Sequence, residues 1–377
     1  TPLYEPIIEG KTVIVQAGHY LNYLGILELS WDAGERRVNV MNDVESTPFL
    51  KPLNKDVPED EEIAAEVDRY ESILNDWIAE LTMGEVVDIR RVVATSSFPI
   101  QRNRPQRESA IGNYITDALK RAAEEALGKP VDIAVQANGA IRSDIVIGTE
   151  EWSNEMISFY DLVMATGLGS GKDGNPGYPM VSFYLTEDEV RRALEVSVLL
   201  SGLRGDNFFL QFSGLSMMYD PGRAVLFKIP FSGTPIPTSR AVLSAELNRS
   251  GQDPVPVRKG NDTLLHVVTD YYIAGFLPLV GEVVPNLAIQ LRDENGSSVD
   301  LDETIIYRDE GQLKVWQAVL EYTLSHETNE EGLPVIPAQY EEPEGRLIMT
   351  FTLPLWVWPL VALFIVVSVI IVIVKRR

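Results

Sequence analysis

Two arginines separated by one helix and one strand are the residues of this sequence best suited to bind an anion. Arg107 lies just before a helix that Ser109 or a neighbour could cap, and Arg142 follows a buried strand and a loop that carries Asn138. A helix followed by a returning strand can bring its two ends together, so both guanidinium groups could share one pocket. Guanidinium groups are always charged and fork-shaped, which suits phosphate and other planar anions. The alternative is that both arginines are surface residues and that Asn138-Gly139 is only a turn.

Helices are expected where start and stop signals frame periodic apolar residues. Gly128-Lys129-Pro130 ends the helix that follows Arg107, at Leu127. Thr186 with Glu189 predicts a capping box for a helix through Leu200. A long acidic helix over residues 59–83 has a one-sided apolar stripe, and a further helix is expected near residues 314–324.

The remaining segments predict strands joined by loops. Extended segments are expected at residues 10–48, 86–100, 183–185, 208–219, 224–229 and 264–272. Residues 169–177 are rich in glycine and have little capacity for regular structure. Proline, glutamate and asparagine dominate residues 327–345, and this composition indicates a stalk.

The composition excludes several classes of function. The 377 residues, 45% of them apolar, suffice for a large core and for more than one folding unit. The formal net charge of -23 argues against a nucleic-acid partner, because a phosphate backbone needs a basic surface. The chain has no cysteine, so disulfides, thiolate catalysis and zinc–thiolate sites are excluded.

The C-terminal end predicts a membrane anchor. Residues 353–374 carry no charge and are long enough to cross a bilayer as a helix. Trp356 and Trp358 lie at one end of this segment and Lys375-Arg376-Arg377 at the other. Because positive residues stay in the cytoplasm, the folded part is expected outside the cell membrane. A cell-wall sorting signal and a lipid-anchor signal fit less well, because the segment lacks the Thr-Gly of the first and the polar spacer of the second.

Several motifs of the chain resemble the 5'-nucleotidase family. The resemblance to its C-terminal domain rests on Arg107-Glu108, Gly112-Asn113, Asp117-Ala118, Asp132-Ile133-Ala134 and Gly139-Ala140-Ile141-Arg142. The resemblance to the end of the preceding metallophosphatase domain rests on Gly10 to Gly18 and on Tyr23-Leu24-Gly25. Since that match begins within a domain and the chain starts at Thr1 without a signal peptide, we expect that the amino-terminal part is missing.

The resemblance implies a mixed α/β (α+β) fold with mixed sheets and flanking helices. A linker helix and one C-terminal transmembrane helix are expected in addition. The expected organisation is the terminal strands of a truncated metallophosphatase domain (1–50), an inter-domain linker helix (51–84), a substrate-binding 5'-nucleotidase C-terminal domain (85–326), an acidic stalk (327–352), the transmembrane helix (353–374) and a cytoplasmic tail (375–377).

The resemblance also implies how a nucleotide would be held. Arg107 and Arg142 match arginines that contact its ribose and phosphate side, and Asn138 is a weaker match that lies one residue closer to Arg142 than in the family. The family stacks the base between two phenylalanines, and Leu168 and Tyr272 stand at these positions. Tyr272 could equally be a core tyrosine.

The substrate itself is left open by the residues that follow Tyr272. In the family a Gly-Gly-Asp motif supplies the carboxylate that binds the ribose hydroxyls, whereas this chain has Phe276-Leu277-Pro278. The substrate could therefore be a nucleotide, another phosphate ester, a cyclic nucleotide or a nucleotide sugar.

The resemblance places catalysis outside this chain. In the family a pair of divalent metal ions in the amino-terminal domain activates water, and the ligand motifs Asp-x-His, Gly-Asn-His and Gly-His-x-His do not occur here. No metal site is expected in this chain, which would hydrolyse nothing by itself. The expected function is therefore the substrate-recognition portion of an extracytoplasmic phosphoesterase in nucleotide catabolism. A surface-anchored nucleotide- or anion-binding module and a purely structural role are the alternatives.

Overall fold

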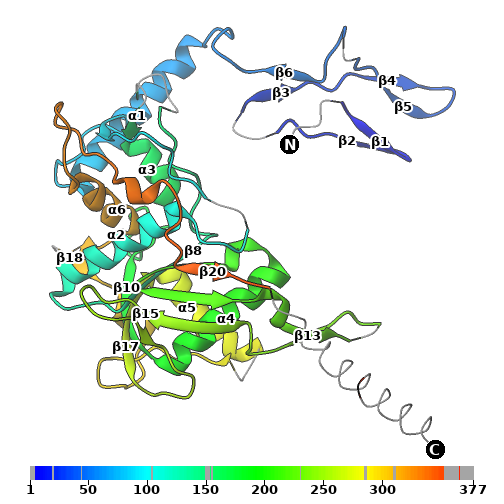
Figure 1. The fold of residues 1–377 in the computed structure, drawn as a ribbon. Coiled ribbons are helices and arrows are strands. Elements are labelled where there is room, and N and C mark those ends of the chain that lie inside the picture. Colours follow the sequence, from blue (N-terminus) through cyan, green and yellow to red (C-terminus); the bar gives the residue numbers. More distant parts are fainter. Residues whose placement is uncertain are drawn as a thin grey trace, which may run out of the picture. The chain divides into compact units, whose positions relative to one another are not determined.

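A computed structural model provides the structure of the protein. It describes residues 5–18, 21–43, 45–102, 105–148, 153, 156–229, 231–283, 287–308, 311–351 and 365. The chain divides into two compact units, Thr1–Leu74 and Asn75–Arg377 (Figure 1). Each unit is described by itself below.

The first unit holds short antiparallel strand pairs and the start of helix α1 (Glu61–Leu81). The pairs are β1 (Ile7–Glu9) with β2 (Thr12–Ile14), β3 (Tyr23–Gly25) with β6 (Leu50–Pro52), and β4 (Leu29–Asp32) with β5 (Arg37–Val40). Strands were predicted over residues 10–48, and the structure confirms extended segments there. Among the described side chains of this unit, only Phe49 and Leu50 are buried. These strands therefore have almost no core of their own.

The second unit is built on a four-stranded mixed sheet. Its strand order is β10 (Met180–Thr186), β17 (Leu264–Asp270), β8 (Ile133–Ala137) and β11 (Leu210–Ser213). β17 and β8 run parallel, whereas β10 and β11 are antiparallel to their neighbours. Successive side chains of a strand point to opposite faces. Ile133 and Val135 accordingly join one hydrophobic core and Ala134 joins the other.

Helices contribute to both cores of the second unit. α2 (Ala110–Leu127), α3 (Phe159–Thr166) and α6 (Val315–Leu324) supply side chains to the core that contains Ala134, and they lie close together in Figure 1. α4 (Glu187–Arg204) and α5 (Tyr271–Val283) supply side chains to the other core. The sheet with helices in both cores confirms the predicted mixed α/β class.

A second sheet and three small strand pairs complete this unit. The second sheet has the order β16 (Val255–Pro256), β15 (Val242–Leu247), β12 (Leu215–Tyr219) and β20 (Leu347–Met349). The pairs are β7 (Val92–Ala94) with β9 (Ile157–Ser158), β13 (Val225–Lys228) with β14 (Pro235–Pro237), and β18 (Tyr307–Arg308) with β19 (Gly311–Gln312). Short 3-10 turns lie at Asp206–Phe208, Pro221–Arg223, Leu301–Thr304 and Ala338–Tyr340.

The predicted helix signals act as expected. Ser109 caps α2 by accepting a hydrogen bond from the backbone N–H of Gly112 at 3.1 Å, and Gly128 ends the helix with a φ of 64°. Thr186 and Glu189 form the capping box that begins α4. One boundary was wrong, because β17 ends at Asp270 and Tyr272 belongs to α5. The side chain of Asp270 accepts from the N–H of the third helical residue, and this bond favours a helix start over a longer strand.

Residues 327–351 pack on the second unit, so the prediction of a stalk over this segment was wrong. β20 runs parallel to β12, and Tyr340 is fully buried. Arg346 forms two parallel bonds to the carboxylate of Asp117 on α2, at 2.8 and 2.7 Å. Buried Glu108 accepts a hydrogen bond from the backbone N–H at the start of β20, at 2.9 Å. A few buried contacts thus order a segment whose composition is that of a tether.

The predicted membrane anchor lies outside the described part of the chain. Residues 353–374, except Ile365, and the tail 375–377 are not described. Among the residues that the structure does describe, no helix has the length and apolar character to cross a bilayer. The anchor therefore stays a prediction.

Candidate functional site

A cavity of about 370 Å³ opens where β8 ends, with walls from α4 and α5. Three of the predicted site residues, Arg142, Leu168 and Tyr272, line it together although they are far apart in the sequence. The other lining residues are Ala137, Gly139, Ala140, Tyr178, Ala193, Val196, Ser197, Leu200, Asn207, Phe208, Leu210, Ile273, Phe276 and Leu277. The volume is in the range of small-molecule sites, which are mostly apolar with a few convergent polar groups.

The loop after β8 fixes Arg142 at this cavity. The backbone N–H of Gly139 donates to the carbonyl of Asn207 at 3.0 Å, and that of Arg142 donates to the carbonyl of Ala165 at 2.9 Å. Position 139 requires glycine, because a Cβ there would lie 2.9 Å from the carbonyl oxygen of Asn207. The Arg142 side chain is exposed and donates to the Gly139 carbonyl at 3.2 Å. No carboxylate pairs with it among the described residues, so its charge is free for a ligand.

A tyrosine directly after the glycine-rich loop adds a second ring beside Tyr272. The N–H of Tyr178 donates to the carbonyl of Leu168 at 2.9 Å, and the Tyr178 ring stacks on Tyr272 at 5.5 Å between centroids and 18° between planes. Gly169 has a φ of 82°, and a Cβ there would lie 2.3 Å from the Tyr178 ring. Only glycine therefore lets the loop bring this ring over Tyr272.

Two phenylalanines extend the aromatic lining. Phe208, at the end of a 3-10 turn, and Phe276, on α5, lie 5.8 Å apart with a tilt of 48°. Phe208 and Tyr178 were not predicted from the sequence as site residues, and Phe276 was noted only as part of the segment that replaces the Gly-Gly-Asp motif. The available signal for Tyr178 and Phe208 was their position, since Tyr178 directly follows Gly177 and Phe208 follows Gly205 at the end of α4.

Arg107 and Asn138 do not line the cavity, although their loops are tied to it. The side-chain amide of Gln211 donates to the carbonyl of Arg107 and to the Asn138 side chain, both at 2.9 Å. Asp206 accepts from Asn138 at 2.9 Å and from the backbone N–H of Gln106 at 2.5 Å. Asn138 thus has structural partners, and the exposed Arg107 lies on a neighbouring loop. Contact of either residue with a ligand stays a prediction.

A buried carboxylate lies close to the aromatic pair. Asp270 accepts a hydrogen bond from the N–H of Ile273 at 2.8 Å, while its Oδ2 has no hydrogen-bond partner among the described residues. Burial raises the pKa of Asp270 to about 6. Burial and then the charge of Asp270 raise the pKa of Tyr178, so this phenol stays neutral at pH 7. The cavity therefore presents a neutral aromatic wall and a single cation among its described lining residues.

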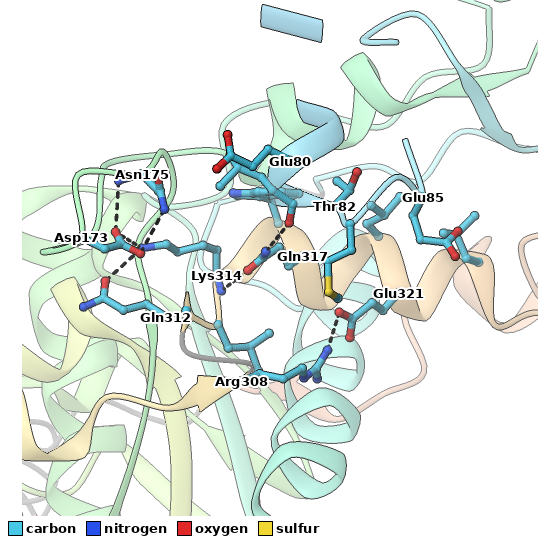
Figure 2. A pocket seen from close by; sticks show the side chains of 17 residues that line it. Glu80, Thr82, Glu85, Asp173, Asn175, Arg308, Gln312, Lys314, Gln317 and Glu321 are labelled. Carbon is cyan, nitrogen blue, oxygen red and sulfur yellow. Dashed lines mark hydrogen bonds and ion pairs between the residues drawn. The ribbon is translucent and has the colours of Figure 1, made fainter. Parts of the chain in front are cut away.

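A second cavity, of about 390 Å³, lies between the end of α1 and the start of α6 (Figure 2). Its cations already have partners. The ammonium group of Lys314, whose side chain is 2% exposed, donates to Asp173 at 2.7 Å and to Gln312 at 2.9 Å. Arg308 is paired with Glu321, as the dashed lines in Figure 2 show.

The pairing in the second cavity indicates a structural role. Burial lowers the pKa of Lys314, and the adjacent Asp173 opposes this shift. Gln317 on α6 donates to the carbonyl of Leu81 at 3.1 Å, which joins α6 to the end of α1. These bonds hold the cavity walls together and leave neither cation free for an anionic ligand.

The described residues do not form a metal site. No group of three or more histidine or acidic side chains in that part of the chain is close enough to hold a metal ion. The divalent metal pair that the resemblance implies would thus need ligands from elsewhere.

The fold and the first cavity define a mixed α/β domain whose cavity holds Arg142, unpaired among the described residues, together with several aromatic side chains. Residues 88–275 match the family described as 5'-nucleotidase, C-terminal domain, and this part of the chain belongs to that family.

Curated relatives agree with this family. The chain is 28% identical over 335 residues to a 5'-nucleotidase from Diplobatis ommata, which covers 86% of this chain and 49% of that protein. It is 27% identical over 227 residues to a snake venom 5'-nucleotidase from Crotalus adamanteus, which covers 58% of this chain and 34% of that protein. The chain therefore spans about half the length, or less, of these relatives.

A solved structure shares the fold. The crystal structure of a 5'-nucleotidase precursor from Thermus thermophilus matches with a TM-score of 0.53 and 20% identity, over 92% of this chain and 54% of that one. A sulfate thiohydrolase from the same genus matches with a TM-score of 0.50 and 15% identity, over 94% of this chain and 50% of that one. At such identities the likeness shows the fold alone.

Proposed function

We propose that this chain is the substrate-recognition portion of an extracytoplasmic 5'-nucleotidase-like metallophosphoesterase, which hydrolyses nucleotides or related phosphate esters. The observation that carries the proposal is the meeting of Arg142, Leu168 and Tyr272 in one cavity. The 5'-nucleotidase names of the curated relatives support the reaction class.

The chemistry of the cavity suits one end of a phosphate ester. An exposed guanidinium without a carboxylate partner among the described residues can donate two parallel bonds to a phosphate. Tyr178, Tyr272 and Phe208 offer aromatic surface for the organic part of the ester. Binding of that remote part positions the reacting phosphate, and a positioned substrate reacts faster than a free one.

Catalysis would depend on residues that the described part of this chain does not supply. The metal pair provides Lewis acidity and the attacking water when bound. The strands of Thr1–Leu74 expose apolar side chains such as Ile8, Leu24 and Trp31, which supports their assignment to the edge of a larger metallophosphatase sheet. Anchoring by residues 353–374, with the folded part outside the membrane and residues 375–377 in the cytoplasm, belongs to the same proposal.

A surface-anchored binding module without catalysis is the second candidate. It is favoured by Phe276-Leu277-Pro278 in place of the Gly-Gly-Asp motif of the family, since the change removes a carboxylate that nucleotide recognition would use. The two candidates share the cavity and differ in whether a metal-binding half accompanies it.

Binding of phosphate esters to the full chain tests the role of the cavity. Calorimetric titration with AMP and 1-naphthyl phosphate is expected to show binding that Arg142→Ala weakens about 10- to 100-fold, the value for a lost charged hydrogen bond. Arg240→Ala, which removes an exposed arginine that does not line the cavity, is the matched control and should leave binding unchanged. Equal affinity in the Arg142→Ala variant would refute the proposal.

Assay of the chain without any added protein tests where the catalytic half lies. Phosphate release from a panel of nucleotides with added manganese or zinc is expected to stay at the level of buffer. Turnover that disappears in the Arg142→Ala variant would place catalysis within this chain and contradict the proposal.

A further inference from the structure

The cavity at Arg142 has two chemically different walls. The loop after β8 supplies Arg142, the one charged residue among the described lining residues. α4 supplies Ala193, Val196 and Leu200, with Ser197 as its single polar contribution within the described lining. The Ser197 hydroxyl accepts a hydrogen bond from the backbone N–H of Leu210 at 2.9 Å, so its oxygen is partly satisfied within the protein.

The wall from α5 has no charged side chain among the described lining residues, and Phe276-Leu277-Pro278 stands where the family has its Gly-Gly-Asp motif. Phe276 and Leu277 line the cavity, and Phe276 packs against Phe208 at 5.8 Å. Asp270, the carboxylate directly before α5, is 1% exposed and does not line the cavity. Ribose hydroxyls placed against this wall would lose their bonds to water without gaining a charged partner, and this loss is unfavourable.

From this arrangement we infer that the cavity recognises phosphate esters of flat apolar alcohols, such as aryl phosphates, in preference to ribonucleotides. The phosphate lies at Arg142, and the apolar group lies between α4 and α5 against Phe276 and Tyr272. The inference rests on the proposed function, because it names the substrate class of the same site. It assigns Phe276 as a specificity residue that disfavours a ribose.

Four probes separate the contributions to binding. 1-Naphthyl phosphate has the flat ring and the phosphate, AMP adds a ribose between them, 1-naphthol lacks the phosphate, and ribose 5-phosphate lacks the ring. Calorimetric titration of the full chain is expected to give 1-naphthyl phosphate at least about 10-fold tighter affinity than each of the other three.

Two variants locate the apolar wall. Phe276→Asp is expected to weaken the binding of 1-naphthyl phosphate about 10-fold and to bring its affinity close to that of AMP. Phe227→Asp introduces the same charge at an exposed phenylalanine on β13, outside the cavity, and should change neither affinity. Ala193→Leu fills the cavity from α4, so it should weaken the binding of 1-naphthyl phosphate and leave the binding of ribose 5-phosphate unchanged. Ala193→Leu therefore tests the apolar wall even if Phe276→Asp does not fold.

The outcomes distinguish this inference from the function on which it rests. AMP binding that equals or exceeds that of 1-naphthyl phosphate, and that depends on Arg142, overturns the inference and leaves the proposed function standing. 1-Naphthol binding as tightly as its phosphate overturns the inference, because the anion then contributes nothing. Absence of binding by all probes, or binding that Arg142→Ala does not change, refutes the proposed function itself.

Discussion

The two cavities of the second unit are similar in volume and opposite in their treatment of charge. The cavity between α1 and α6 brings its own counterions, so Lys314 faces Asp173 and Arg308 faces Glu321. The cavity at the end of β8 leaves Arg142 without a carboxylate among the described residues, and its lining includes several aromatic side chains. Charges that are paired within a cavity hold its elements together, whereas an unpaired charge beside an apolar wall is available to bind an external anion.

The largest effect is expected when a counterion is removed from the paired cavity. Asp173→Asn should lower the free energy of unfolding by about 3 kcal/mol, because the ammonium group of Lys314 would stay buried without its partner. Urea unfolding followed by circular dichroism measures the change. The double variant Asp173→Asn/Lys314→Met should recover most of the loss, since no buried charge remains. A loss below about 0.5 kcal/mol in the single variant would show that the pair is hydrated.

Asp270 is a buried carboxylate near the aromatic cavity, and removal of its charge is expected to stabilise the protein, whereas removal of the Asp173 charge destabilises it. The pKa of Asp270 is raised from 3.8 to about 6, so the folded protein keeps this proton to higher pH than the unfolded chain. Stability is therefore lost as the pH rises through this interval, and it stays low above it. Asp270→Asn keeps the oxygen that accepts from Ile273 and removes the charge, so it should stabilise by about 2 kcal/mol above pH 7.

The pH dependence supplies the control for this variant. Urea unfolding at pH 4 should show a much smaller difference between Asp270→Asn and the native sequence. At this pH the Asp270 carboxyl is protonated in the folded chain, so the cost of burying its charge is largely absent. A gain of the same size at pH 4 and pH 8 would mean that the charge of Asp270 is not responsible.

The smallest effect is expected at the aromatic wall. Tyr272→Ala should weaken the binding of 1-naphthyl phosphate about 10-fold, which is the effect of losing one stacked ring. Tyr272 is 59% exposed, and Tyr307, which is 57% exposed on β18, is a matched control outside the cavity. Equal affinities of Tyr272→Ala and Tyr307→Ala by calorimetry would remove the stacking interaction from the proposal. Stability should change little in either variant, because both rings are largely in water.

The sequence predicted the parts of the fold that local chemistry decides. Ser109 and Gly128 delimit α2 through hydrogen bonds and a left-handed backbone, and both signals depend on a few adjacent residues. The stalk was predicted wrongly because its order depends on Arg346 meeting Asp117, more than two hundred residues away in the sequence. Contacts of that separation leave no local pattern.

The candidate site shows the same division. Arg142, Leu168 and Tyr272 were placed by motif position, and the structure brings them together. Tyr178 escaped notice because its role depends on how the loop from Gly169 to Gly177 folds back, which glycine-rich sequence does not reveal. Asn138 was a weaker match to the asparagine of the family, and the structure shows Gln211 and Asp206 bonded to its side chain.

The parallel pairing of β20 with β12 decides where this protein can be shortened. A boundary chosen from composition, near residue 327, would delete β20 and leave the edge of β12 open to strands of other molecules. The same cut would remove Arg346, which pairs with Asp117, and the backbone N–H of Leu347, which donates to Glu108. Shortened versions for crystallisation or display therefore need every residue through Met349, and a version ending earlier is expected to aggregate.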